Sequence, residues 1–183
     1  MGTAQSISCI ETNEKDLSVY LTPRQISLVQ ETWHQINDDL PKLGLLIFLK
    51  FFQTEPEMKS LFPKIIKMNE SNQLEWDIDN EMLTKHAVTV LEGLGAAVEN
   101  LDDSDFLNSV LISIGQTHVK RNVKPQMLKK LWPSLQHGLR VTLGDRYTKE
   151  VNESWKRVYQ YIGIQMRKGM ENPDAEFNEN IVT

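Results

Sequence analysis

Two segments with helical periodicity each place one histidine on their apolar face, and this pattern constrains the fold more than any other feature. Apolar residues recur at steps of three, four or seven: Leu83, Val90, Leu94 and Ala97 around His86, and Leu107, Leu111 and Ile114 around His118. Both imidazoles are therefore expected to point inward. An inward histidine is commonly a core residue bonded to a neighbour, but two on separate helices can face each other across a cavity. The pattern leaves both interpretations open.

Helical periodicity continues through the chain, with helix starts and stops marked by capping residues, proline and glycine. Thr22, Pro23 and Gln25 form a predicted capping box, an aspartate or asparagine among residues 77–80 can cap the His86 helix, and Gly144 and Gly169 read as helix ends. No segment indicates a strand, and residues 63–78 read as a polar connection. Seven to eight amphipathic helices without a heptad run or a repeat predict one all-α globule.

Two residues, a glycine and a proline, lie where they would destabilise the interior of a predicted helix. Gly44 lies one turn before Phe48, and a glycine there predicts that another helix crosses closely. A tolerated glycine is the alternative. Pro133 lies inside the segment that begins at Pro125, where it should kink a helix near residues 129–133.

Composition limits the classes of function that the chain can serve. The net charge is −5, and no cluster of lysine and arginine is interleaved with aromatic residues, which argues against nucleic acid as a partner. No apolar run approaches the ~20 residues of a membrane span, and the N-terminus lacks a signal sequence. The single cysteine, Cys9, excludes an internal disulfide and any cysteine-rich metal site, consistent with a reducing cytosol.

The two ends of the chain are expected to lie outside the fold. Residues 1–20 read as a flexible arm, residues 21–170 as the folded domain, and residues 171–183 as an acidic, disordered tail. The first six residues, from Met1 through Gly2 to Ser6, match the N-myristoylation pattern. One acyl chain binds membranes only marginally, and the acidic arm repels anionic lipid, so Cys9 is the candidate for a second, palmitoyl chain. An incidental exposed thiol is the alternative for Cys9.

Together these features resemble the globin family over about residues 21–170. The matching residues are Leu21-Thr22-Pro23 with Trp33, Phe48, Phe52, Glu55-Pro56, Leu61-Phe62-Pro63, His86 with Val90, and His118 with Val123 and Pro125. Among globins, the spacing and the pairing of Phe48 with His86 are most similar to neuroglobin and globin X. Some globin X proteins are acylated at the N-terminus. For this chain, that implies a place on the cytoplasmic face of the plasma membrane, or in the cytoplasm if it is not acylated.

The resemblance implies a haem b pocket and a role for each of its residues. His118 would be the proximal iron ligand and His86 the distal histidine, which can also bind the iron. Phe62 would pack on the haem, Phe48 and Val90 would line the distal side, and Val123 and Leu128 would border the other edge. Ile114 belongs to the same apolar lining, and a carbonyl near it should accept a hydrogen bond from His118. Gly44 would face Ala87 at a close helix crossing.

Three functions fit such a pocket. The first is a six-coordinate haem protein for redox protection or gas signalling, which binds dioxygen, nitric oxide, carbon monoxide or nitrite. The second is a five-coordinate oxygen carrier, with His86 as a hydrogen-bond donor. The third is a haem enzyme that reduces nitrite or oxidises nitric oxide. No flavin or nicotinamide domain is fused to the chain, so such an enzyme needs an external reductase. A fourth alternative is a haem-free helical sensor. The inward pair of histidines disfavours it, because such a sensor needs no such pair.

Overall fold

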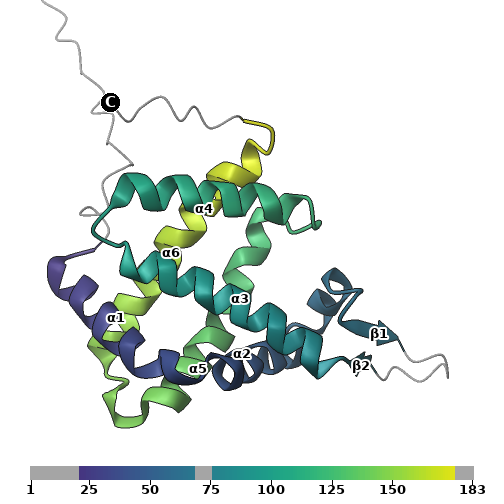
Figure 1. Ribbon diagram of the computed structural model, residues 1–183, viewed down its shortest axis with the longest axis horizontal. Helices are drawn as coiled ribbons and strands as arrows, with labels where there is room; N and C mark the ends of the chain where they lie inside the picture. The colour runs from purple at the N-terminus through teal and green to yellow at the C-terminus, as the bar shows by residue number, and fades with distance from the viewer. Residues whose placement is uncertain (1–20, 69–75, 176–183) are drawn as a thin grey trace, which may run out of the picture.

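Helices account for nearly all of the secondary structure in this computed structural model, which describes residues 21–68 and 76–175 (Figure 1). The α-helices of these ranges are α1 (Pro23–Ile36), α2 (Leu40–Thr54), α3 (Asn80–Glu99), α4 (Ser104–Val119), α5 (Trp132–Leu143) and α6 (Lys149–Glu171). Short 3₁₀ helices are η2 (Asn37–Asp39), η3 (Pro56–Leu61), η4 (Pro125–Leu131) and η5 (Gly144–Arg146). The predicted all-α class is confirmed, and the number of helices is close to the prediction.

Side-chain caps start the helices where the sequence indicated. At α1, Thr22 Oγ1 accepts from the Gln25 N–H at 3.3 Å while Gln25 Oε1 accepts from the Thr22 N–H at 3.0 Å, which confirms the capping box. Asp79 caps α3 through the N–H of Met82 at 2.9 Å. Gly144, with a φ of 53°, ends α5 as predicted.

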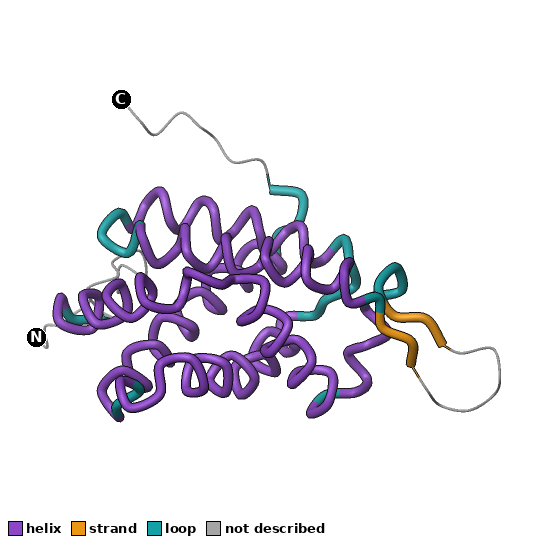
Figure 2. The backbone as a smooth tube through the Cα atoms, turned by 60° about the horizontal axis from the view of Figure 1, so that its bottom comes forward, coloured by secondary structure: helices purple, strands orange, loops and turns teal. Residues whose placement is uncertain are grey.

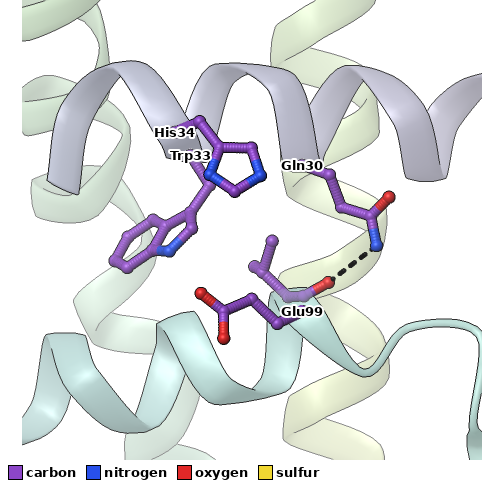
Figure 3. Close-up of a pocket in the computed structure, with 5 residues that line it drawn as sticks. Gln30, Trp33, His34 and Glu99 are labelled. Atoms are coloured by element: carbon purple, nitrogen blue, oxygen red, sulfur yellow. Dashed lines mark hydrogen bonds between the residues drawn. The ribbon is translucent and has the colours of Figure 1, made fainter.

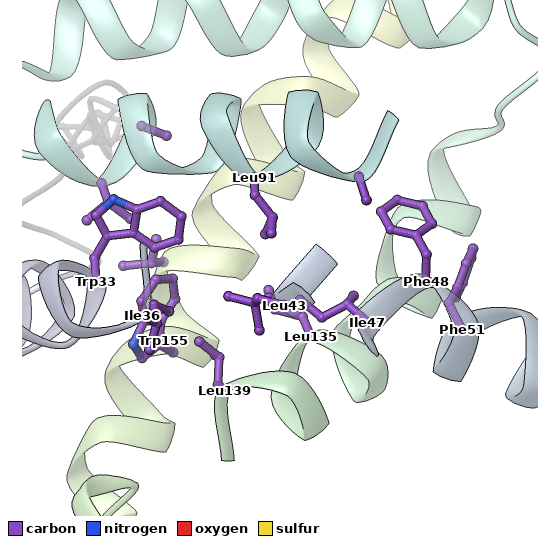
Figure 4. Close-up of a cluster of buried hydrophobic side chains, with 14 of the residues drawn as sticks. Trp33, Ile36, Leu43, Ile47, Phe48, Phe51, Leu91, Leu135, Leu139 and Trp155 are labelled. Atoms are coloured by element: carbon purple, nitrogen blue, oxygen red, sulfur yellow. The ribbon is translucent and has the colours of Figure 1, made fainter. Parts of the chain in front are cut away.

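The core lies between α2 and the helices that cross it. Helix α2 packs on α3 and on α5, α4 crosses over α6, and α1 packs against α6. Figure 4 shows the side chains that fill the centre, including Trp33, Leu43, Ile47, Leu91, Leu135 and Trp155. Gly44 allows the crossing of α2 and α3, because a β-carbon added there would lie 2.7 Å from the Ala87 β-carbon. The close crossing predicted at Gly44 is confirmed.

The connection before α3 contains two strands, which the sequence analysis did not predict. Strands β1 (Ile66–Met68) and β2 (Trp76–Ile78) pair antiparallel at one end of the helical body (Figure 2). The N–H of Asp79 donates to the Ile65 carbonyl at 2.8 Å, and the N–H groups of Ile65 and Ile66 donate to the Phe62 carbonyl. With three residues each, these strands are too short to show alternating hydrophobicity.

The segment around Pro133 is divided and is not one kinked helix. Residues Pro125–Leu131 form η4, and Pro133 occupies the first turn of α5, which begins at Trp132. Proline lacks an N–H group, and its ring clashes with the carbonyl four residues earlier. The first turn of a helix tolerates both defects, so α5 begins at Trp132 and the residues before it close into a tighter 3₁₀ helix.

Gly169 was expected to follow the last helix, but it lies inside α6. A β-carbon at Gly169 would lie 1.9 Å from the carbonyl oxygen of Ile112, and one at Gly115 would lie 2.0 Å from the carbonyl oxygen of Met166. These two glycines bring the backbones of α4 and α6 into direct contact. Gly169 therefore serves a close helix crossing and not a helix end.

A buried hydrogen bond joins α1 to α6 and gives a test of the core. Trp155 Nε1 donates to Thr32 Oγ1 at 2.9 Å, and Thr32 Oγ1 donates to the Leu28 carbonyl at 2.6 Å. We expect Thr32→Val to lower the free energy of unfolding by about 1–3 kcal/mol, because it leaves the indole N–H buried without a partner. Thr32→Ser keeps the hydroxyl and is the control in urea unfolding. Equal stability of the two variants would show that the bond contributes nothing.

Candidate functional site

His118 lies near the end of α4 with its side chain half-buried and its orientation fixed. The Nδ1 atom lies 2.8 Å from the carbonyl oxygen of Ile114, one turn earlier, as predicted. A carbonyl oxygen can only accept, so Nδ1 carries the proton, and in a neutral imidazole this leaves the lone pair on Nε2. The predicted hydrogen bond is confirmed, and it leaves Nε2 as a metal-binding atom whose basicity the bond raises.

His86 projects from α3 against two phenylalanine rings. Its ring centroid lies 5.2 Å from that of Phe48 and 5.3 Å from that of Phe62, and both pairs are close to perpendicular. Phe62 also contacts Phe52, with ring centroids 5.0 Å apart. Helix α2 supplies two of these phenylalanines, and the turn after η3 supplies the third. The rings hold the His86 imidazole at the edge of an aromatic cluster.

The surroundings of His86 favour its neutral form. Burial lowers the pKa of the His86 imidazole, and the charge of Arg121 and the electrostatic influence of His118 lower that pKa further. His86 is therefore neutral at neutral pH, with a ring nitrogen free to bind a metal or donate a hydrogen bond. These two imidazoles, with an aromatic and apolar lining, fit the requirements of a haem.

The remaining predicted pocket residues are buried or half-buried. Phe48 is buried in the core, and Phe62, Val90, Ile114 and Leu128 are half-buried and packed against it. Val123 is also half-buried, and its N–H donates to the His118 carbonyl at 3.2 Å. The structure thus joins Phe48 and Phe62 to His86 by ring contacts, and Ile114 and Val123 to His118 by hydrogen bonds. Gly2 and Cys9, the candidate acylation sites, lie outside the described residues.

Arg121 is a residue that the sequence analysis missed. Its charge contributes to the lowered pKa of His86. Its position depends on the turn after α4, where Asn122 has a φ of 61° and the N–H of Arg121 donates to the His118 carbonyl. No periodicity or motif in the sequence indicates that this turn brings Arg121 toward α3.

Other features of the described residues do not add to this site. A cavity of about 220 Å³ lies between α1 and the end of α3, lined by Gln30, Trp33, His34, Val98 and Glu99 (Figure 3). None of the predicted site residues lines it. Within residues 21–68 and 76–175, no cluster of three or more histidine, cysteine, aspartate or glutamate side chains could hold a metal ion. Among the helices of these ranges, none combines the length and apolarity that crossing a bilayer requires.

Sequence comparisons connect this fold to known proteins. Neuroglobin from Tetraodon nigroviridis is 25% identical over 149 residues, which cover 81% of this chain and 92% of the relative. Cytoglobin-2 from Danio rerio is 28% identical, covering 81% of this chain and 82% of the relative. A plant relative, an anaerobic nitrite reductase from Brassica napus, is 24% identical and covers 86% of this chain and 97% of that protein.

A solved structure and a family model agree with these relatives. The crystal structure of a hexacoordinated heme protein from an anhydrobiotic tardigrade has a TM-score of 0.73 and 24% identity, and covers 85% of this chain and 99% of that chain. The model of the family named Globin matches residues 45–166, which is more than half of the chain and includes both histidines. The chain therefore belongs to the globin family.

Proposed function

We propose that this globin binds one b-type haem through Nε2 of His118, with His86 as the second axial ligand when no gas is bound. The observation that carries the proposal is the pair of imidazoles, one with its tautomer fixed by Ile114 and the other held neutral beside Phe48 and Phe62. When bound, the haem supplies an iron atom that coordinates imidazole and small gases and exchanges single electrons.

The chain's own residues set the conditions for this chemistry. The Ile114 carbonyl holds the proton of His118 at Nδ1, which would leave Nε2 available to bind a haem iron. Phe48 and Phe62 limit the access of water to His86 and restrict its ring. Because the sequence contains no Cys-x-x-Cys-His run, haem retention rests on axial ligation and apolar burial, as in a b-type site.

The visible absorption spectrum tests the coordination. The ferrous, ligand-free wild type is expected to be six-coordinate, and His86→Leu is expected to be five-coordinate, because leucine fills similar space without a ligand atom. His34→Leu, at an exposed position on α1, is the matched control and should keep the wild-type spectrum. A five-coordinate wild type would favour the alternative of an oxygen carrier, in which His86 only donates a hydrogen bond.

We infer that the ligands are dioxygen, nitric oxide, carbon monoxide and nitrite, and that the role is redox protection or gas signalling. A second axial histidine slows ligand entry, which suits this role better than bulk oxygen carriage. The alternative is a haem enzyme that reduces nitrite or oxidises nitric oxide with an external reductase. The similarity to a relative named as an anaerobic nitrite reductase favours testing it. Nitric oxide release from nitrite, under anaerobic conditions with excess reductant, measures this activity.

We also propose that acylation at Gly2 and Cys9 tethers the globin to the cytoplasmic face of the plasma membrane. The support is the match of the first six residues to the myristoylation pattern, and the need for a second anchor in an acidic arm. With a C-terminal fluorescent tag in animal cells, we expect wild type at the plasma membrane, Gly2→Ala in the cytosol and Cys9→Ser between the two. An evenly cytosolic wild type would contradict the tether.

A further inference from the structure

A groove of about 710 Å³ lies between η4 and the face of α6 that is turned away from the core. We call it the η4–α6 groove. Lys129 of η4 and Lys156, Arg157 and Arg167 of α6 line it, with Glu153 as the acidic side chain of the lining. The whole chain has a net charge of −5, so this basic groove differs in sign from the chain as a whole. Such a concentration of positive charge attracts acidic partners and steers their approach.

The groove also offers apolar surface between its charged sides. Leu128 and Tyr159 contribute to the lining, and Ile164 is 37% exposed, one of the large exposed hydrophobic side chains of the described residues. At Gly163, a β-carbon would meet no atom within 4 Å, so the surface there is open. Apolar contacts within a charged rim are typical of a surface that binds another protein.

The groove is connected to the proximal side of the candidate haem site. Helix η4 follows the turn in which the His118 carbonyl accepts from the N–H of Val123. Tyr159 Oη donates to the Leu128 carbonyl at 2.6 Å, which ties η4 to α6 at the groove. Leu128 thus belongs both to the groove and to the predicted haem lining. A protein docked in the groove would therefore lie beside Leu128, which the resemblance places in the haem lining.

We propose that the η4–α6 groove is the docking surface for an acidic protein that donates single electrons. One electron would pass from the donor to the ferric haem iron that His118 and His86 would hold, which would become ferrous with no transfer of atoms. The inference rests on the proposed haem binding. The chain's own acidic end is a weaker candidate for the groove, because Gln116 Nε2 donates to the carbonyls of Asn172 and Ala175 and so holds the residues after α6 against α4.

Flavodoxin, a strongly acidic one-electron carrier, is a suitable probe. Reduced flavodoxin is mixed with the ferric, haem-loaded full chain at low salt, and the second-order rate of reduction is followed at the Soret band. We expect Lys129→Glu/Lys156→Glu to slow this reaction by about tenfold or more, and the difference from wild type to shrink at high salt. Calorimetry with oxidised flavodoxin should show the same loss of binding without any electron transfer.

A matched double variant controls for net charge. Lys42→Glu/Lys50→Glu changes the charge equally but on α2, so its rates should stay near those of wild type. Reduced riboflavin, which is small and carries no phosphate group, should reduce all three proteins at similar rates. A chain without a Soret band would reject the proposed haem binding, whereas a haem-loaded groove variant with unchanged rates and affinity would reject only the docking surface.

Two further experiments test whether something other than an acidic protein occupies the groove. If wild type binds flavodoxin only after residues 176–183 are removed, those residues occupy the groove and the proposal is wrong. Vesicles that contain phosphatidylserine test the other source of negative charge. If the groove variant loses vesicle binding but keeps its affinity for flavodoxin, the groove is a lipid-binding surface and the proposal is again overturned. Loss of flavodoxin binding in the groove variant alone supports it.

Discussion

Replacing His118 by alanine is expected to lower haem affinity by more than about 100-fold, because loss of even an outer-shell partner of a metal ligand costs 10–100-fold. His118 is the imidazole whose free Nε2 is fixed by a hydrogen bond, at 2.8 Å, to the Ile114 carbonyl. Its removal leaves retention to apolar contacts and to His86. Haem titration of the apoprotein, followed at the Soret band, measures the change.

Two controls distinguish a lost ligand from a damaged fold. His34→Ala is the same substitution at an exposed site and should leave the titration unchanged. His118→Gly creates space for free imidazole, and added imidazole should restore the spectrum. An unchanged spectrum in His118→Ala would show that another residue is the axial ligand.

Alanine at Gly115 or Gly169 is expected to have the largest effect on folding. The added β-carbon would lie 2.0 Å from the Met166 oxygen or 1.9 Å from the Ile112 oxygen, and in both cases the obstacle is backbone. Helices α4 and α6 must then move apart, which we expect to lower the free energy of unfolding by about 3 kcal/mol or more. For a domain with a total stability of about 5–15 kcal/mol, this is a large fraction. Urea unfolding gives the value.

Gly163 provides the matched control on the same helix. A β-carbon there meets no atom within 4 Å, so Gly163→Ala should raise stability by about 0.5–1 kcal/mol through the helix propensity of alanine. Because Gly115 lies one turn before His118, Gly115→Ala should also perturb the haem spectrum, while Gly163→Ala should not. If Gly115→Ala and Gly163→Ala were equally stable, the close crossing would be wrong.

Local signals predicted much of the fold. The capping residues Thr22 and Asp79 and the stop at Gly144 act within four residues of sequence, so their geometry follows from the local chain. The bond from His118 to Ile114 is local in the same way, because one helical turn separates its partners. Gly44 was interpreted correctly because a glycine in the middle of an apolar helix lowers helix stability unless a neighbouring helix needs the space.

Features that depend on distant segments could not be predicted. Gly169 looked like a helix end because glycine commonly ends helices, and only the contact with Ile112 shows its role. The influence of Arg121 on His86 requires the turn after α4 and the position of α3 together. Pro133 indicated a disruption correctly, but whether a helix bends or begins anew depends on how the preceding residues pack.

The backbone bonds around β1 restrict how His86 can move. The Asp79 N–H, at the start of α3, donates to the Ile65 carbonyl, and the Ile65 N–H donates to the Phe62 carbonyl, so these two bonds join the first turn of α3 to the Phe62 turn. Sliding of α3 along its axis would break these bonds, whereas tilting about the Asp79 end would keep them. His86 lies within two turns of that pivot, where a tilt displaces atoms least. We therefore expect His86 to move between its iron-bound and its iron-free position by rotation of its side chain. The neighbouring Phe48 and Phe62 rings would set the rate of this rotation.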